Sequence, residues 1–329
     1  MKKSLLILFF TCWALFFAAF RPVMPFAAET AAFPDGTPVT GGRILMGTIG
    51  EPSNLIPYMA SDSASGEITG LLYVAPLKYD KDLNVVPWAA ASYEVLEGGR
   101  LLRFVLRDDI RWEDGVPLTA DDVEFTYKLM IDPKTPTAYS GDFLAIESFK
   151  KTGRLSFEVR YAKPFARSLM TWMGAILPKH VLEGQDIMTT PVARKPIGAG
   201  PYRLAKWDAG SMLTLTASDT YFEGRPNLDE VVYRIIPDPS TMFLELKAGK
   251  LDMMSLSPQQ YLRQTQGPQW ERDWRKYRYL SFSYTFLGFN LEHPFFKDVR
   301  VRRAISMAID RQSLIDGVLL GQGVPTVGP

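Results

Sequence analysis

The chain has almost no cysteine and almost no histidine. Its one cysteine, Cys12, lies in the apolar N-terminal run, and its two histidines, His180 and His293, lie far apart in the sequence. A single thiol cannot form an intramolecular disulfide or a cysteine-ligated zinc site. Neither histidine has a partner at metal-ligand spacing such as H-E-x-x-H. The composition therefore excludes a disulfide scaffold and gives no support to a zinc enzyme.

Other catalytic patterns are missing as well. No G-x-S-x-G elbow occurs, so a hydrolase serine has no local support. The stretch "IGAGPYRL" (197–204) has two glycines but lacks the Lys-Ser/Thr of a phosphate-binding loop. The acid pairs Asp108/Asp109 and Asp121/Asp122 are sequence neighbours, which places them poorly for converging on one substrate atom. We expect a protein that is not an enzyme, without a metal or other cofactor.

Charge of either sign is not in excess. The formal net charge is +1, so electrostatics favours neither nucleic acid nor an anionic membrane surface as a partner.

The N-terminus has the layout of a targeting segment. Lys2 and Lys3 precede an apolar run from Leu5 to Phe20, and small residues follow at Ala27 and Ala28. This pattern predicts a signal peptide over residues 1–28, with an uncleaved membrane anchor as the alternative.

One short segment is rich in carboxylates. "RDDIRWEDGVPLTADDVEF", Arg107–Phe125, fails as an EF-hand: with Gly115 at position 6, Ile110 and Trp112 occupy ligand positions 1 and 3. Thr119 followed by Asp122 instead matches an N-cap with a short capping-box acid. The segment therefore predicts a turn and a helix start.

Periodicity predicts a mixed α/β chain of more than one domain. In "RLLRFVLR" Leu102, Phe104 and Leu106 alternate with arginines, as in a half-buried strand. Further strands are expected over 41–50, 155–161, 211–218 and 230–237. Helices are expected from about Glu67, from a Ser240 cap to Gly249 with a strand after it, and over "DVRVRRAISMAIDR", whose apolar face is Val301, Ala304, Ile305, Ala308 and Ile309.

Together these blocks resemble one family. They run in order from about Gly47 to the C-terminus. The blocks are "GTIGEPSNLIPYMA", "RFVLRDDIRWEDGVPLTADDVEFTYKLM", "PIGAGPYRLAKWDAG", "DTYFEGRPNLDEVVYRIIPDPSTMFLELKAGKLDMM" and "LGFNLEHPFFKDVRVRRAISMAIDRQSLIDGVLLGQG". The series is similar to the family 5 extracellular solute-binding proteins, the dipeptide-, oligopeptide- and nickel-binding receptors of ABC importers.

The resemblance implies a periplasmic-binding-protein-like fold of two α/β lobes that close over ligand at a hinge. Its first lobe would comprise residues 42–89 and 191–283, with a family insert over 90–190. The second lobe would begin in residues 284–329. Because family members run considerably longer, the second lobe is expected to be largely absent from this chain.

The resemblance also suggests where ligand binds. The loop "MASDSAS" would offer Ser61, Asp62 and Ser63; the insert would offer Tyr139; the segment that crosses into the second lobe would offer Ser281, Ser283 and Asn290. Loops on a rigid scaffold are where binding residues concentrate. No catalytic or metal-binding residue is expected.

The implied function is the substrate-binding component of an ABC importer. It would be a periplasmic monomer that captures a small peptide or a similar solute between its lobes and delivers it to the permease subunits. A periplasmic enzyme or chaperone-like protein on the same scaffold is the alternative, against which the missing catalytic residues argue.

Overall fold

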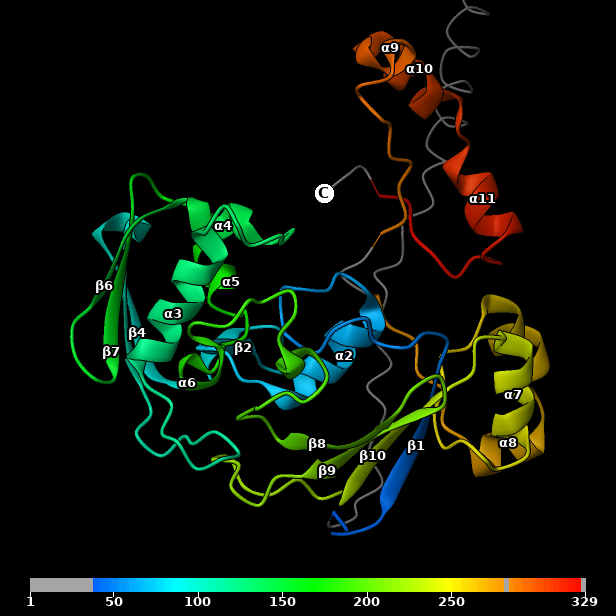
Figure 1. The fold of residues 1–329 in the computed structure, drawn as a ribbon. Coiled ribbons are helices and arrows are strands. Elements are labelled where there is room, and N and C mark those ends of the chain that lie inside the picture. Colours follow the sequence, from blue (N-terminus) through cyan, green and yellow to red (C-terminus); the bar gives the residue numbers. More distant parts are fainter. Residues whose placement is uncertain (1–37, 281–283, 327–329) are drawn as a thin grey trace, which may run out of the picture. The chain divides into compact units, whose positions relative to one another are not determined.

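The structure is a computed structural model that describes residues 38–280 and 284–326. Residues Thr37–Ser255 form one compact unit, and the chain from Leu256 onward belongs to another. Helices and strands are mixed along the chain (Figure 1), as the periodicity predicts. The predicted signal peptide, residues 1–28, lies outside the described residues.

The first four-stranded sheet has the strand order β1-β10-β9-β8. Its strands are β1 (Arg43–Thr48), β8 (Tyr202–Asp208), β9 (Met212–Ala217) and β10 (Glu230–Ile235). β1 pairs in parallel with β10, from Arg43 opposite Glu230, and the other neighbours are antiparallel. In β9, Leu213, Leu215 and Ala217 are buried while the residues between them are half-buried. The strands expected at 41–50, 211–218 and 230–237 are confirmed.

The second four-stranded sheet is antiparallel, in the order β4-β5-β7-β6. It contains β4 (Ala90–Leu96), β5 (Leu101–Leu106), β6 (Ile146–Lys151) and β7 (Ser156–Tyr161). Leu102, Phe104 and Leu106 are buried and Arg103 is exposed, which confirms the predicted alternation. Phe104 stacks on Phe157 with ring centroids 4.8 Å apart, and both contact Trp172, so aromatic rings fill this part of the core.

Helix α3 (Ala120–Ile131) lies along this second sheet (Figure 1). Thr119 is its N-cap, and the Asp122 carboxylate accepts a hydrogen bond from the Thr119 N–H at 2.9 Å, so the predicted capping box is confirmed. Val123 and Met130 are buried on its inner face. The burial of this apolar face holds the helix to the sheet.

Four acids of the carboxylate-rich segment have separate partners. Asp109 pairs with Arg107, Asp114 with His180, Asp121 with Lys151, and Glu124 with Lys128. Gly115, at φ +88°, makes the turn between them. Within residues 38–280 and 284–326, no group of three or more His, Cys, Asp or Glu side chains could hold a metal ion.

Shorter elements complete the unit Thr37–Ser255. They are α2 (Ser63–Leu72), the hairpin β2 (Leu77–Tyr79) and β3 (Val85–Pro87), η1 (Glu97–Gly99), α4 (Ser140–Leu144), α5 (Ser168–Thr171), α6 (Lys179–Leu182), η2 (Pro191–Ala193) and α7 (Pro239–Lys247). Gly47 of β1 lies against α7, because a Cβ there would come 2.7 Å from the Met242 sulfur. α7 therefore packs directly on the first sheet.

Two expected helix starts and one expected strand are wrong. α2 begins at Ser63 rather than near Glu67, because Asp62 caps it. α7 is capped by Asp238, whose carboxylate accepts from the Thr241 N–H at 2.7 Å, and Pro239 takes the first helical position before Ser240. The strand expected after Gly249 is reduced to one bridge between Met46 and Met253.

The unit from Leu256 onward is helical in its described part. It contains η3 (Gln260–Gln264), α8 (Pro268–Asp273), α9 (Pro294–Lys297), α10 (Val299–Ala308) and α11 (Arg311–Gly317). On the expected apolar face of α10, Val301, Ile305 and Ile309 are half-buried, while Ala304 and Ala308 are exposed.

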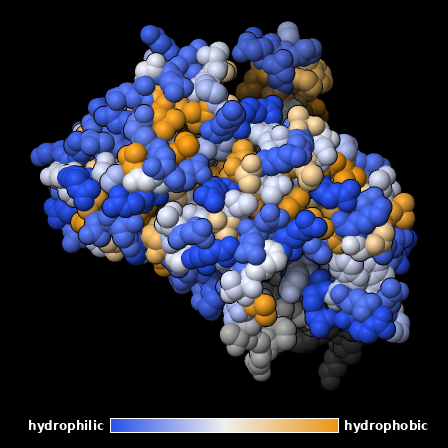
Figure 2. Space-filling model, turned by 60° about the horizontal axis from the view of Figure 1, so that its bottom comes forward, coloured by the Kyte–Doolittle hydropathy of each residue, from blue (hydrophilic) through white to orange (hydrophobic). Residues whose placement is uncertain are grey.

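The surface is mainly polar. Figure 2 shows hydrophilic residues over most of the face it draws, with apolar residues in small groups between them. In the part of the chain that the structure describes, no helix is both long enough and apolar enough to span a bilayer.

Candidate functional site

Ser61, Asp62 and Ser63 lie at the end of the loop that connects β1 to α2, and all three are exposed. Asp62 is the N-cap of α2: its carboxylate accepts hydrogen bonds from the Ser65 N–H at 2.8 Å and from the Ser53 hydroxyl at 2.5 Å. Burial opposes ionisation, but these hydrogen bonds outweigh it and lower the pKa of the Asp62 carboxyl. Asp62 therefore fixes the loop, and Ser61 and Ser63 present their side chains to solvent.

Tyr139 lies beside this same loop. It precedes α4, is 44% exposed, and its ring meets the ring of Tyr58 edge-on with centroids 6.1 Å apart. The Thr137 hydroxyl donates to the Tyr58 carbonyl at 2.8 Å. Two segments that the sequence presented separately, the Ser61–Ser63 loop and the Tyr139 segment, are thus joined through Tyr58.

Sequence reasoning did not single out Tyr58. Its hydroxyl donates to the Ala175 carbonyl at 2.8 Å, and its backbone adopts φ +72°. No sequence pattern predicts either feature. The hydrogen bond joins residues distant in sequence, and a tyrosine rarely adopts a positive φ. The stretch "NLIPYMA" gives only a proline before it, which restricts the preceding residue and not Tyr58 itself.

A small hollow lies under Tyr58. Its lining includes Phe143, Trp172, Gly174 and Ala175 besides Tyr58, and the space amounts to about 220 Å³ with some open solvent included. The enclosed part of this space is only about as large as one water molecule requires, far below the roughly 300–1,000 Å³ of ligand pockets. We therefore regard this hollow as part of the loop's support rather than as the ligand pocket.

The remaining predicted site residues belong to the chain beyond the unit Thr37–Ser255. Asn290 is exposed in the unit that begins at Leu256, where its side-chain oxygen accepts from the Glu292 N–H at 3.0 Å. Ser281 and Ser283 lie outside the described residues. Their role in binding stays a prediction.

The glycine-rich stretch 197–200 supports the other end of α2. A Cβ at Gly198 would come 2.0 Å from the Leu72 carbonyl oxygen, and the Gly200 N–H donates to that oxygen at 2.8 Å. The Glu113 carboxylate accepts from the Gly198 N–H at 3.3 Å. Burial raises the pKa of the Glu113 carboxyl, and this effect outweighs the lowering by the hydrogen bond from Gly198. These glycines permit a close backbone approach, which agrees with rejecting a phosphate-binding loop.

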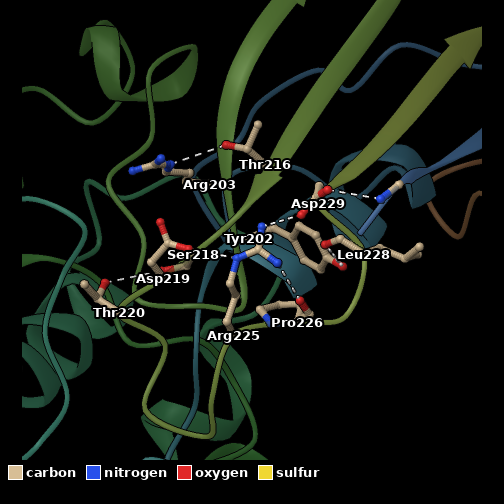
Figure 3. Close-up of polar contacts among 11 residues, drawn as sticks. Tyr202, Arg203, Thr216, Ser218, Asp219, Thr220, Arg225, Pro226, Leu228 and Asp229 are labelled. Atoms are coloured by element: carbon tan, nitrogen blue, oxygen red, sulfur yellow. Dashed lines mark hydrogen bonds and ion pairs between the residues drawn. The ribbon is translucent and has the colours of Figure 1, made fainter. Parts of the chain in front are cut away.

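Arg225 forms another polar cluster in this unit, shown in Figure 3. It donates to Asp219 at 2.8 Å and to Asp229 at 2.5 Å, and Asp229 also accepts from the Gly42 N–H at 3.0 Å. The hydrogen bond from Arg225 lowers the pKa of the Asp229 carboxyl. The cluster ties the β9–β10 connection to the start of β1, which is a structural use of these charges.

Comparison with known proteins gives one consistent result. The family model described as bacterial extracellular solute-binding proteins, family 5 Middle, matches residues 84–329. The oligopeptide-binding protein AppA of Bacillus subtilis is 33% identical over 294 residues, which cover 88% of this chain and 53% of AppA. The chain spans about half the length of the curated relatives it matches.

Solved structures agree with the sequence comparison. The structure of Bacillus subtilis AppA in complex with a nonapeptide matches with a TM-score of 0.78 and 31% identity, covering 88% of this chain and 58% of that one. NikZ of Campylobacter jejuni, solved with Ni(L-His), matches with a TM-score of 0.70 over 85% of this chain and 55% of its own. At 24% identity that second match concerns the fold alone.

Proposed function

Because the chain belongs to family 5 of the bacterial extracellular solute-binding proteins, we propose that it is the substrate-binding component of an ABC importer for peptide-like solutes. The observation that carries this proposal is its similarity, in sequence and in fold, to the oligopeptide-binding protein AppA. The same fold serves other ligands in relatives, so the peptide assignment rests on AppA rather than on fold. The protein binds its ligand without transforming it and hands it to permease subunits.

The proposed organisation follows the family. Residues 42–89 and 191–283 form a first lobe, residues 90–190 an insert, and residues 284–329 the beginning of a second lobe. Residues 1–28 direct export, and the protein works in the periplasm as a monomer. Ligand lies between lobes and closes them by hinge motion, as in periplasmic receptors.

Ser61, Asp62, Ser63 and Tyr139 are the proposed ligand contacts in the first lobe and insert. They are exposed and lie on segments that contact each other through Tyr58. An extended peptide can bind such a loop by main-chain hydrogen bonds, with side-chain pockets giving preference. Ser281, Ser283 and Asn290 are proposed to contact the ligand from the crossing segment.

Calorimetry on the complete gene product that contains this chain tests the function. We expect saturable binding of di- or oligopeptides, and a melting temperature that rises with peptide concentration because ligand binds only the folded state. Ser61→Ala is expected to weaken peptide binding about threefold to tenfold by removing one hydrogen bond. Ser148→Ala, at an exposed position of strand β6, is the matched control and leaves affinity unchanged.

Two results would contradict the proposal. One is the absence of binding to any peptide in the series while the protein is folded. The other is turnover of a bound ligand, which would favour an enzyme on this scaffold.

A further inference from the structure

Tyr58 holds an uncommon backbone conformation. It is one of the non-glycine residues with positive φ, at +72°, and it carries a bulky aromatic side chain. Such a conformation costs free energy and persists only where surrounding contacts determine it. The contacts of Tyr58 therefore indicate what the conformation serves.

Two separate segments, Thr137–Phe143 and the one that contains Ala175, supply these contacts. Thr137 donates its hydroxyl to the Tyr58 carbonyl at 2.8 Å. Ala175 accepts the Tyr58 hydroxyl at 2.8 Å, and Phe143 meets the Tyr58 ring edge-on at 5.9 Å. Both the backbone and the side chain of Tyr58 are thus fixed by the part of the chain between residues 137 and 175.

Gly174 makes room for the Tyr58 side chain. A Cβ at residue 174 would come 2.2 Å from the Tyr58 hydroxyl oxygen and 3.1 Å from the nearest ring carbons. Any larger side chain at this position would have to displace Tyr58 or the backbone around it. The pair Tyr58–Gly174 is therefore a mutual steric fit.

Residues 59–61 are fixed at both ends. Tyr58 stands directly before them, and Asp62, hydrogen-bonded to Ser53 and Ser65, stands directly after them. A loop held in this way is already ordered before ligand binds. Binding then does not include the conformational-entropy cost of ordering the loop.

We propose that Tyr58 is a positioning residue for ligand binding: it joins the Ser61–Ser63 loop to the Thr137–Phe143 segment so that both present their contacts to one ligand. Tyr58 acts through Ser61 and Tyr139 and does not itself contact ligand. This inference rests on the proposed function, because it assumes that the exposed side chains of these two segments bind the same peptide.

Three variants of the complete gene product test it by peptide titration. Gly174→Ala displaces Tyr58 and is expected to weaken peptide affinity at least tenfold. Tyr58→Phe removes the hydrogen bond to Ala175 and is expected to weaken affinity about twofold to tenfold. In the double variant the closest clash is gone, so we expect affinity to recover from the Gly174→Ala value to that of Tyr58→Phe. Gly70→Ala, where no atom lies within 4 Å of the new Cβ, is the control and binds as the wild type.

A double-mutant cycle separates positioning from general destabilisation. Since Tyr58 acts through the Ser61–Ser63 loop, Tyr58→Phe should weaken peptide affinity less when Ser61→Ala is already present than it does in the wild type. Additive effects in this cycle would overturn the proposal, as would wild-type affinity in a folded Gly174→Ala protein. Because the cycle uses only Tyr58→Phe and Ser61→Ala, it tests the proposal even if Gly174→Ala does not fold.

Hydrogen exchange without ligand gives an independent readout. The amides of residues 59–63 are expected to exchange at least tenfold faster in Tyr58→Phe, while those of β5 remain as protected as in the wild type. Unchanged exchange would contradict the positioning role whatever the ligand is. If the wild type binds no peptide, the proposed function fails; if the wild type binds and the variants match it, only this inference fails.

Discussion

Single residues set how closely α2 approaches the 197–200 loop. Gly198 lies under the C-terminal end of this helix, where a Cβ would come 2.0 Å from the Leu72 carbonyl oxygen. The opposing atom belongs to the backbone, so it cannot turn away as a flexible side chain could. The same contact places the Gly200 N–H on that carbonyl oxygen at 2.8 Å. This position therefore tolerates no side chain without a shift of the helix.

Gly198→Ala is expected to lower the free energy of unfolding by about 1–3 kcal/mol or more, as overpacking of a close contact does. The matched control is Gly70→Ala in the exposed interior of α2, which should raise it by about 0.5–1 kcal/mol because alanine favours the helix. Urea unfolding followed by circular dichroism measures both. Equal and small effects of the two substitutions would show that the close approach at Gly198 is unimportant.

The role of the Asp62 carboxylate depends on the residues around it. The sequence placed it among the ligand contacts, and the structure uses its carboxylate as the N-cap of α2 with hydrogen bonds from Ser53 and Ser65. Asp is a preferred N-cap residue, so its local sequence was compatible with this role from the start. Its contact with ligand stays a prediction, while its support of the loop is a feature of the structure.

At the scale of elements, α3 shows how local chemistry fixes a helix start. Thr119 and Asp122 form the reciprocal capping box, and Asp122 also accepts from the Lys179 N–H at 2.9 Å. The cap thus fixes the start of α3 and ties α6 to it. Because α3 packs on the second sheet, a weakened cap affects the support of that sheet as well.

Thr119→Ala is expected to lower the free energy of unfolding by about 1 kcal/mol, within a range of about 0.5–2 kcal/mol, because the hydroxyl no longer accepts from the first turn. Thr119→Ser keeps the hydroxyl and should lose far less. Chemical unfolding with the same denaturant for all three proteins measures the difference. An equal loss in the serine variant would mean that the methyl group, and not the cap, is responsible.

At the scale of the whole molecule, the described strands and their core belong to the unit Thr37–Ser255. Both four-stranded sheets and the β2–β3 hairpin lie within it, and the main cluster of buried apolar residues runs from Leu55 to Tyr233. A unit with its own core can fold by itself. The chain covers 53% of the length of AppA.

The fragment 37–255 is therefore expected to unfold cooperatively, with the near-ultraviolet circular dichroism of its buried tryptophans, Trp112 and Trp172, retained. A fragment ending at Ile236 is the control. It lacks α7, whose Met242, Phe243 and Leu246 are buried, and should unfold at a clearly lower temperature. Failure of the longer fragment to fold would show that the chain beyond Ser255 is needed for this core.

The sequence by itself determined the features that depend on neighbouring residues: the capping box of Thr119, the alternation in 101–106, the turn at Gly115 and the ordered blocks of the family. Such features are set by hydrogen bonds and periodicity within a few residues, so they can be read along the chain. Only the tertiary structure decided that Asp62 caps α2, that Gly198 lies against Leu72, and that Tyr58 joins the Ser61–Ser63 loop to Tyr139. The contacts of Gly198 and Tyr58 join residues distant in sequence, the Ser53 hydroxyl that holds Asp62 comes from earlier in its loop, and Tyr58 has a positive φ that no local preference would have favoured.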